Sequence, residues 1–188
     1  MEIVNGIGIK SGFIDENGCE ELISDFESSR ERQYQGDLTT GVDLEVKDCI
    51  EMAYNIKNVD EYNNLVVEYL EEYTRGVDYK YLDLWYLGSH WEGSKYKKYI
   101  KKKGHYNYVH QEKDGYPTLK NRLFSCLLYL NSVDIGGETI FPLHQLVSKP
   151  ESGKVIIWPS GFPYLHYATT PISDDKYAIN SWLVIDYE

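Results

Sequence analysis

The sequence predicts an α+β protein that is mainly β, with helices packed on the outside of a sandwich or barrel of strands. Two observations favour this class. Two early stretches place apolar residues at helical spacing, and from about residue 79 the chain consists of short aromatic and β-branched runs. Because 188 residues fit one domain with a full core, we expect a single domain over 1–188, with helical support over roughly 1–78 and the strands over roughly 79–188.

Two helices are predicted in the first part. The first covers 15–29, where Asp15 can cap the helix and apolar residues recur at i, i+3, i+4 and i+7. The second covers 60–74, where Asp60 can cap and a broad stripe of Tyr, Leu and Val follows one face. A tyrosine-rich stripe of this kind is typical of core packing, so we assign it no binding role.

Short strands are predicted for the remainder of the chain. Gly and Pro turn signals separate them, among them Gly136-Gly137 and Pro159-Ser160-Gly161. Many short strands at this spacing indicate a sandwich or barrel. The expected strands are 79–87, 105–112, 122–131, 138–143, 154–159, 164–168 and 177–187.

Composition limits the cellular compartments and the binding partners to be expected. The formal net charge of −11 argues against a nucleic-acid partner, because phosphate binding needs clustered cations. No signal peptide is visible and no apolar stretch approaches membrane-spanning length, so we expect no membrane association. Cys19, Cys49 and Cys126 are odd in number and widely spaced, and two of them lie in apolar patterns, which is typical of buried thiols in a reducing compartment. We expect a cytoplasmic location, or the host cytoplasm if the source is a virus.

One basic segment stands out against this acidic background. The stretch "KYKKYIKKKGH", Lys95 to His105, carries six lysines. One interpretation is a solvated edge strand, since lysine protects sheet edges from pairing. The other is a docking surface for an acidic partner beside the active site.

A group of ligand-type residues lies in the predicted strands. His110 and Glu112 are two apart, so on a strand they point to one face. Alone, this pair is also typical of a polar strand end. His166 and, ten residues later, Lys176 make the set more specific. Two imidazoles and one carboxylate suit a non-haem Fe(II) site, and a lysine can pair with the far carboxylate of a metal-bound dicarboxylate.

Five motifs follow one another in a family-like order. They read "RLFSCLLYLN", "GGETIFP", "PESGKVIIWP", then His166, then "KYAINSW". In this order they resemble the 2-oxoglutarate- and Fe(II)-dependent dioxygenases, in particular the prolyl 4-hydroxylase-like branch. The resemblance is strongest from Gly104 to Trp182. It implies a double-stranded β-helix, the cupin-like jelly roll, supported by N-terminal helices.

The resemblance also implies roles for individual residues. His110, Glu112 and His166 take the Fe(II)-ligand positions, and Lys176 and Tyr129 take positions that contact the distal carboxylate of 2-oxoglutarate. Strand alternation extends the candidate cosubstrate pocket. The added candidates are Ser125, on the face of Tyr129, and Asn180 and Trp182, on the face of Lys176. For Trp182, packing inside the barrel is an equal alternative.

Two positions depart from the family pattern. The family usually has Asp where this chain has Glu112, so the oxygen must reach the iron through a different rotamer. Many prolyl hydroxylases have a tyrosine three residues before the first His. Here that position is Asn107, with Tyr106 and Tyr108 on either side.

The function implied is hydroxylation of prolyl or other side chains in a peptide or protein, with O2 consumed and succinate and CO2 released. Fe(II), 2-oxoglutarate and O2 are the implied cofactors, with ascorbate as a further candidate. Two alternatives remain open from the residues. One is a cupin-like metal enzyme that does not use 2-oxoglutarate and has no need of Lys176. The other is a non-catalytic jelly-roll binding module.

Overall fold

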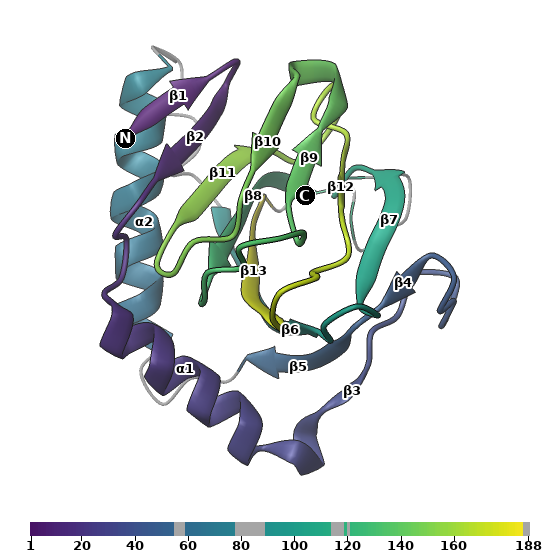
Figure 1. Cartoon of the computed structure of the whole chain (residues 1–188). Coiled ribbons are helices and arrows are strands. Elements are labelled where there is room, and N and C mark those ends of the chain that lie inside the picture. Colours follow the sequence, from purple (N-terminus) through teal and green to yellow (C-terminus); the bar gives the residue numbers. More distant parts are fainter. Residues whose placement is uncertain (55–58, 78–88, 114–118, 120, 186–188) are drawn as a thin grey trace.

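A computed structural model describes the chain except residues 55–58, 78–88, 114–118, 120 and 186–188 (Figure 1). Both predicted helices are confirmed, as α1 (Glu16–Ser28) and α2 (Val59–Gly76). The side chain of Asp15 caps α1 by accepting a hydrogen bond of 2.8 Å from the Gly18 amide. The second cap was predicted wrongly, because α2 begins at Val59 and Asp60 already lies inside it.

The strands within the described residues form two antiparallel sheets, as the jelly-roll prediction requires. The larger sheet has the order β1 (Glu2–Val4), β2 (Ile7–Lys10), β11 (Val155–Pro159), β8 (Arg122–Tyr129), β13 (Lys176–Ile185), β6 (Ser89–Tyr99), β5 (Ile50–Tyr54), β3 (Tyr34–Gln35). The smaller sheet has the order β10 (Leu146–Ser148), β9 (Thr139–Phe141), β12 (His166–Ala168), β7 (His105–His110), β4 (Lys47–Asp48). Short 3-10 helices cover Arg30–Arg32 and Pro142–His144.

The N-terminal part is more than helical support. Strands β1 to β5 come from it, and β2 and β5 extend the larger sheet on either side of the C-terminal strands. The predicted strand 79–87 falls on residues outside the described part of the chain. Over the part that is described, no helix is long and apolar enough to cross a membrane.

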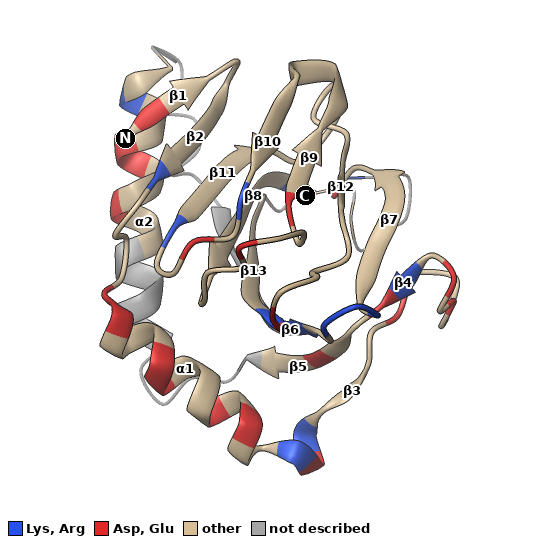
Figure 2. Cartoon of the chain, viewed as in Figure 1, with Lys and Arg blue, Asp and Glu red and all other residues tan. Residues whose placement is uncertain are grey.

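The lysine-rich segment does not form an edge strand, which was one of its two interpretations. Strand β6, which carries its first lysines, pairs with β13 on one side and with β5 on the other. The N-terminal strand β5 covers the edge that sequence reasoning left open. Figure 2 shows these basic residues on β6, whereas α1 is rich in acidic residues.

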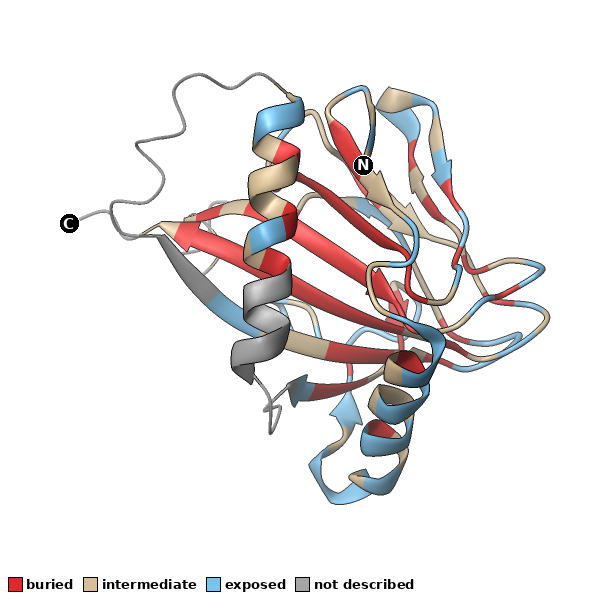
Figure 3. Cartoon of the chain, turned by 90° about the vertical axis from the view of Figure 1, so that its left-hand side faces the viewer, coloured by how far each residue is buried: buried red, intermediate tan, exposed pale blue. Residues whose placement is uncertain are grey.

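Alternate residues of the central strands enter two different cores. One core lies between the larger sheet and the helices and contains Cys126, Leu128 and Ile179. The other lies between the two sheets and contains Tyr129 and Ala178. Figure 3 shows the buried central strands behind α2. The three cysteines are buried free thiols, as predicted.

Candidate active site

The three predicted ligand-type residues converge between the sheets. His166 on β12 lies opposite His110 on β7 in the strand register, and Glu112 follows two residues after His110. The Oε1 atom of Glu112 lies 3.6 Å from Nε2 of His166 and 3.9 Å from Nε2 of His110. Ligand atoms from all three lie within 4.8 Å of one another. One metal ion can therefore contact all three side chains.

Hydrogen bonds orient both imidazoles. Nδ1 of His110 lies 2.8 Å from the Tyr108 carbonyl oxygen, and Nδ1 of His166 lies 3.1 Å from the Tyr164 carbonyl oxygen. A carbonyl oxygen only accepts, so each Nδ1 carries the proton and each Nε2 keeps its lone pair for the centre of the site. The Tyr106 ring stacks on His110 at a centroid distance of 3.9 Å and holds that ring in place.

The second oxygen of Glu112 is held by two donors. Trp182 Nε1 donates to Glu112 Oε2 at 3.0 Å, and a guanidinium nitrogen of Arg122 donates to the same atom at 3.2 Å. Arg122 is itself fixed by Glu92 through two bonds of 2.6 Å. This arrangement leaves Oε1 facing the histidines. It shows how a glutamate, one methylene longer than the usual aspartate, is held in one geometry.

The protonation states suit a divalent cation. Burial, together with nearby His166, lowers the pKa of His110 to about 3, so its imidazole is neutral at pH 7. Burial alone would raise the pKa of Glu112, but the neighbouring His166 and the charge of Lys97 outweigh it and hold the pKa well below its usual value. Two imidazole nitrogens and one carboxylate match the donor set of a non-haem Fe(II) site.

A buried lysine lines the same cavity as the triad. Lys176 is 2% exposed, and its ammonium donates to the Gly137 carbonyl oxygen at 2.7 Å. The ammonium lies 5.2 Å from the ring centroids of both Tyr99 and Tyr129. Burial and the charge of Lys97 lower the pKa of Lys176 to about 7. An entering carboxylate would favour the charged ammonium, as expected for an anion contact.

The other predicted pocket residues take different places. Asn180 lines the cavity, but Ser125 lies outside its described lining and forms a 2.7 Å hydrogen bond with the Ser160 hydroxyl. The Tyr129 hydroxyl donates to Thr139 Oγ1 at 2.8 Å, so the ring packs beside Lys176 while its hydroxyl is already engaged. Trp182 lines the neighbouring groove and holds Glu112.

Among the residues of the cavity wall that were not predicted from the sequence are Lys97, Tyr99 and Thr139. Lys97 and Tyr99 lie on β6 opposite Ala178 and Lys176 of β13. The alternation of Lys97 and Tyr99 was visible in the sequence. The strands that pair with β6 were not, so the cavity that these two residues line could not be predicted.

A wider groove open to solvent reaches the triad from outside. Tyr106 lines both the groove and the inner cavity, whereas Tyr108 is 63% exposed and lines the groove alone. Asn107 is exposed. Tyr106 therefore takes the inner position beside the site, and the register of β7 against β12 shifts between Tyr106 and His110, the stretch that contains Asn107.

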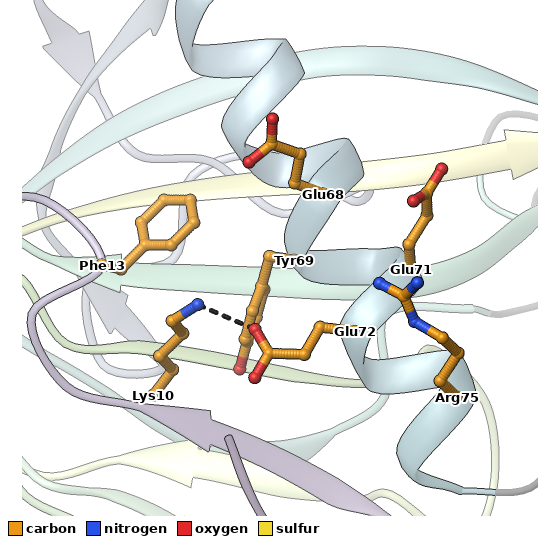
Figure 4. A pocket seen from close by; sticks show the side chains of 7 residues that line it. All are labelled: Lys10, Phe13, Glu68, Tyr69, Glu71, Glu72 and Arg75. Carbon is orange, nitrogen blue, oxygen red and sulfur yellow. Dashed lines mark hydrogen bonds and ion pairs between the residues drawn. The ribbon is translucent and has the colours of Figure 1, made fainter.

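A separate hollow lies on the helix side of the larger sheet (Figure 4). There Glu72 of α2 pairs with Lys10 at 2.7 Å and with the N-terminal ammonium of Met1 at 2.8 Å. These pairs fasten the N-terminal strands to α2. We assign the hollow a structural role.

Comparison with known proteins agrees with this geometry. Residues 94–184 match the family model of the 2OG-Fe(II) oxygenase superfamily. No curated protein matches the chain significantly.

Solved structures of prolyl hydroxylases are similar to the chain. A viral collagen prolyl hydroxylase from Paramecium Bursaria Chlorella virus-1, in its 2OG complex, is 18% identical with a TM-score of 0.68, over 97% of each chain. A Pseudomonas putida prolyl-4-hydroxylase is 15% identical with a TM-score of 0.73, over 95% of this chain and 92% of that one. A Trichoplax adhaerens prolyl hydroxylase in complex with a hypoxia inducible factor peptide fragment is 16% identical with a TM-score of 0.74, over 96% and 84%. At this identity the likeness shows a shared fold.

Proposed function

Since residues 94–184 belong to the 2OG-Fe(II) oxygenase superfamily, we propose that the whole chain forms one dioxygenase domain that hydroxylates prolyl or other side chains of a peptide or protein. Its cofactors are Fe(II), 2-oxoglutarate and O2. One observation carries the proposal: the His110, Glu112 and His166 donor atoms converge in the same cavity as the buried ammonium of Lys176.

Each residue of the site has a distinct task in this proposal. His110, Glu112 and His166 hold Fe(II), which with 2-oxoglutarate and O2 supplies the oxidising chemistry and yields succinate, CO2 and a hydroxylated product. Lys176 binds the distal carboxylate of 2-oxoglutarate, with the rings of Tyr99 and Tyr129 beside its ammonium. Trp182 and Arg122 position Glu112.

The groove supports a polypeptide substrate. Tyr106, Tyr108 and Trp182 line it, and aromatic faces accept prolyl and aliphatic side chains. A peptide is bound in the Trichoplax structure, and the viral and Pseudomonas proteins are named as prolyl hydroxylases. The net charge of −11 favours a peptide over a nucleic acid. The buried free thiols support a reducing compartment such as the cytoplasm.

An anaerobic titration tests the proposal. Fe(II) and then 2-oxoglutarate are added to metal-free protein, and the visible metal-to-ligand charge-transfer band is recorded. We expect the band to appear, to be lost in His110→Ala, and to require much more 2-oxoglutarate in Lys176→Ala. His144→Ala and Lys98→Ala are matched controls, because both residues lie outside the triad and the inner cavity.

Other outcomes identify the alternatives. Iron binding without a band would favour a cupin-like metal enzyme that does not use 2-oxoglutarate. No iron binding would leave a jelly-roll binding module. With a band present, succinate release in air that rises when a proline-containing peptide is added supports the substrate class.

A further inference from the structure

The first three lysines of the lysine-rich segment are divided between the two faces of β6. Lys98 points toward the helix side, where it pairs with Glu27 of α1 at 2.6 Å. Lys95 and Lys97 line the groove that leads to the triad. We infer that Lys95 and Lys97, with Lys47 of β4, form an anion-binding wall that takes a carboxylate side chain of the substrate polypeptide. This inference rests on the proposed function and specifies the substrate class.

A single buried carboxylate organises the three lysines. Glu51 of β5 is 0% exposed and lies opposite Lys97 in the register of β5 and β6. Its carboxylate oxygens lie 2.6 Å from Lys47 Nζ, 3.3 Å from Lys95 Nζ and 3.9 Å from Lys97 Nζ. The three ammonium groups therefore converge on one wall of the groove.

The lysines in this cluster outnumber the carboxylates. Among the described residues Lys47, Lys95 and Lys97 share two, Glu51 and, 3.8 Å from Lys95, the half-exposed Asp37. The nearby charge of Glu112 is shared with Arg122 and with the proposed metal. A buried excess charge is costly unless a counter-charge is supplied. An entering carboxylate supplies one.

Lys97 is the least satisfied of the three. Its side chain is 7% exposed, and among the described residues its nearest carboxylate oxygen, on Glu51, lies 3.9 Å away, beyond hydrogen-bond distance. Lys47, by contrast, also donates to the Asp37 carbonyl oxygen at 2.7 Å. Lys97 therefore has donors available for a ligand.

The location of the cluster ties it to the substrate. Lys47 and Lys95 line the outer groove, and Lys97 lines both the groove and the inner cavity. An acidic side chain bound here would lie close to the substrate residue at the triad. In a chain with a net charge of −11, this local excess of positive charge selects for acid at one point and does not attract polyanions in general.

Two matched peptides test the inference on the full chain. Without O2, protein loaded with Fe(II) and 2-oxoglutarate is titrated calorimetrically with acetyl-Gly-Glu-Pro-Gly-Glu-Pro-Gly-amide and with its Gln counterpart. We expect the Glu peptide to bind roughly tenfold more tightly. Lys97→Met and Lys95→Met should remove this preference. Lys98→Met, on the same strand but the opposite face, should keep it.

Three results would overturn the inference. The first is equal affinity for the two peptides, which includes binding of neither. The second is a preference for the Glu peptide that is unchanged in both Lys95→Met and Lys97→Met. The third is a Lys97→Met variant whose only defect is a higher 2-oxoglutarate requirement. Lys95 is partly exposed, so its variant remains informative if Lys97→Met does not fold. The charge-transfer band is read on the same samples. Its absence contradicts the oxygenase proposal, whereas the peptide ratio reports only on the lysine cluster.

Discussion

Strands β8 and β13 have two faces that are equally buried but differ in chemistry. On the helix side, Leu128 and Ile179 are 0% exposed and pack among apolar neighbours. On the inner side, Lys176 is 2% exposed and Asn180 is 5% exposed. Burying the first pair releases apolar surface from water and stabilises the fold, whereas burying the second costs desolvation. A fold keeps such costly groups where they bind something, so the outer face supports stability and the inner face supports function.

Removing an inner-face ligand should have the largest effect. We expect His166→Ala to abolish Fe(II)-dependent activity and the charge-transfer band, because the site then has one imidazole and one carboxylate. Thermal unfolding monitored by circular dichroism should remain cooperative. His144→Ala is the control, since His144 stacks on Tyr164 outside the triad. A His166→Ala protein with normal turnover would exclude this residue as a ligand.

Adjacent leucines on β8 test the two faces directly. Leu128→Ala should lower the free energy of unfolding by about 2–5 kcal/mol, because it leaves a cavity beneath the helices. Its 2-oxoglutarate affinity, measured at low temperature, should stay near that of the unmodified protein. Leu127→Ala, on the inner face, enlarges the cavity beside the triad and should weaken 2-oxoglutarate binding. Equal effects of both variants on 2-oxoglutarate binding would contradict the assignment of stability to the outer face and of function to the inner face.

The features that could be predicted from the sequence are those that depend on local spacing or on motif order, and not on strand pairing. Helix α1 and its Asp15 cap follow from local spacing, and the structure confirms them. Motif order singled out His110, Glu112 and His166, and the structure brings their donor atoms together. Strand partners follow from pairing over long distances, which local spacing does not encode. Because β5 was not foreseen beside β6, an edge strand and a docking surface beside the active site both remained possible for Lys97, and the structure places it in the wall of the site.

The hydrogen bonds within the site could not be predicted from the sequence either. Trp182 was predicted to line the cosubstrate pocket or to pack in the barrel, and it holds Glu112 Oε2. Strand alternation gives the face of a side chain but not its partner. The hydrogen bonds by which Trp182 and Arg122 hold Glu112 could therefore be identified only from the structure.

A smaller effect is expected when the hydrogen bond from Trp182 to Glu112 is removed. Trp182→Phe removes the indole donor to Glu112 while keeping an aromatic ring, and we expect Fe(II) affinity to fall by about 10- to 100-fold. Trp158→Phe is a matched control, because Trp158 Nε1 is buried without a hydrogen-bond partner among the described residues. Competition with a chelator measures both. Similar losses in the two variants would point to ring volume, and not the hydrogen bond, as the cause.

The smallest effect should come from the outer layer, at the start of α1. Asp15→Ala removes the side chain that accepts from the Gly18 amide and should lower the free energy of unfolding by about 1 kcal/mol. Asp25→Ala removes the same charge from an exposed position of α1 without touching the cap, so it should change stability less. Urea denaturation compares the two. Because α1 packs on the face opposite the triad, Fe(II) and 2-oxoglutarate binding should be unchanged in both. A binding defect in Asp15→Ala would show that the helix layer also shapes the site, and the separation of the two faces would then fail.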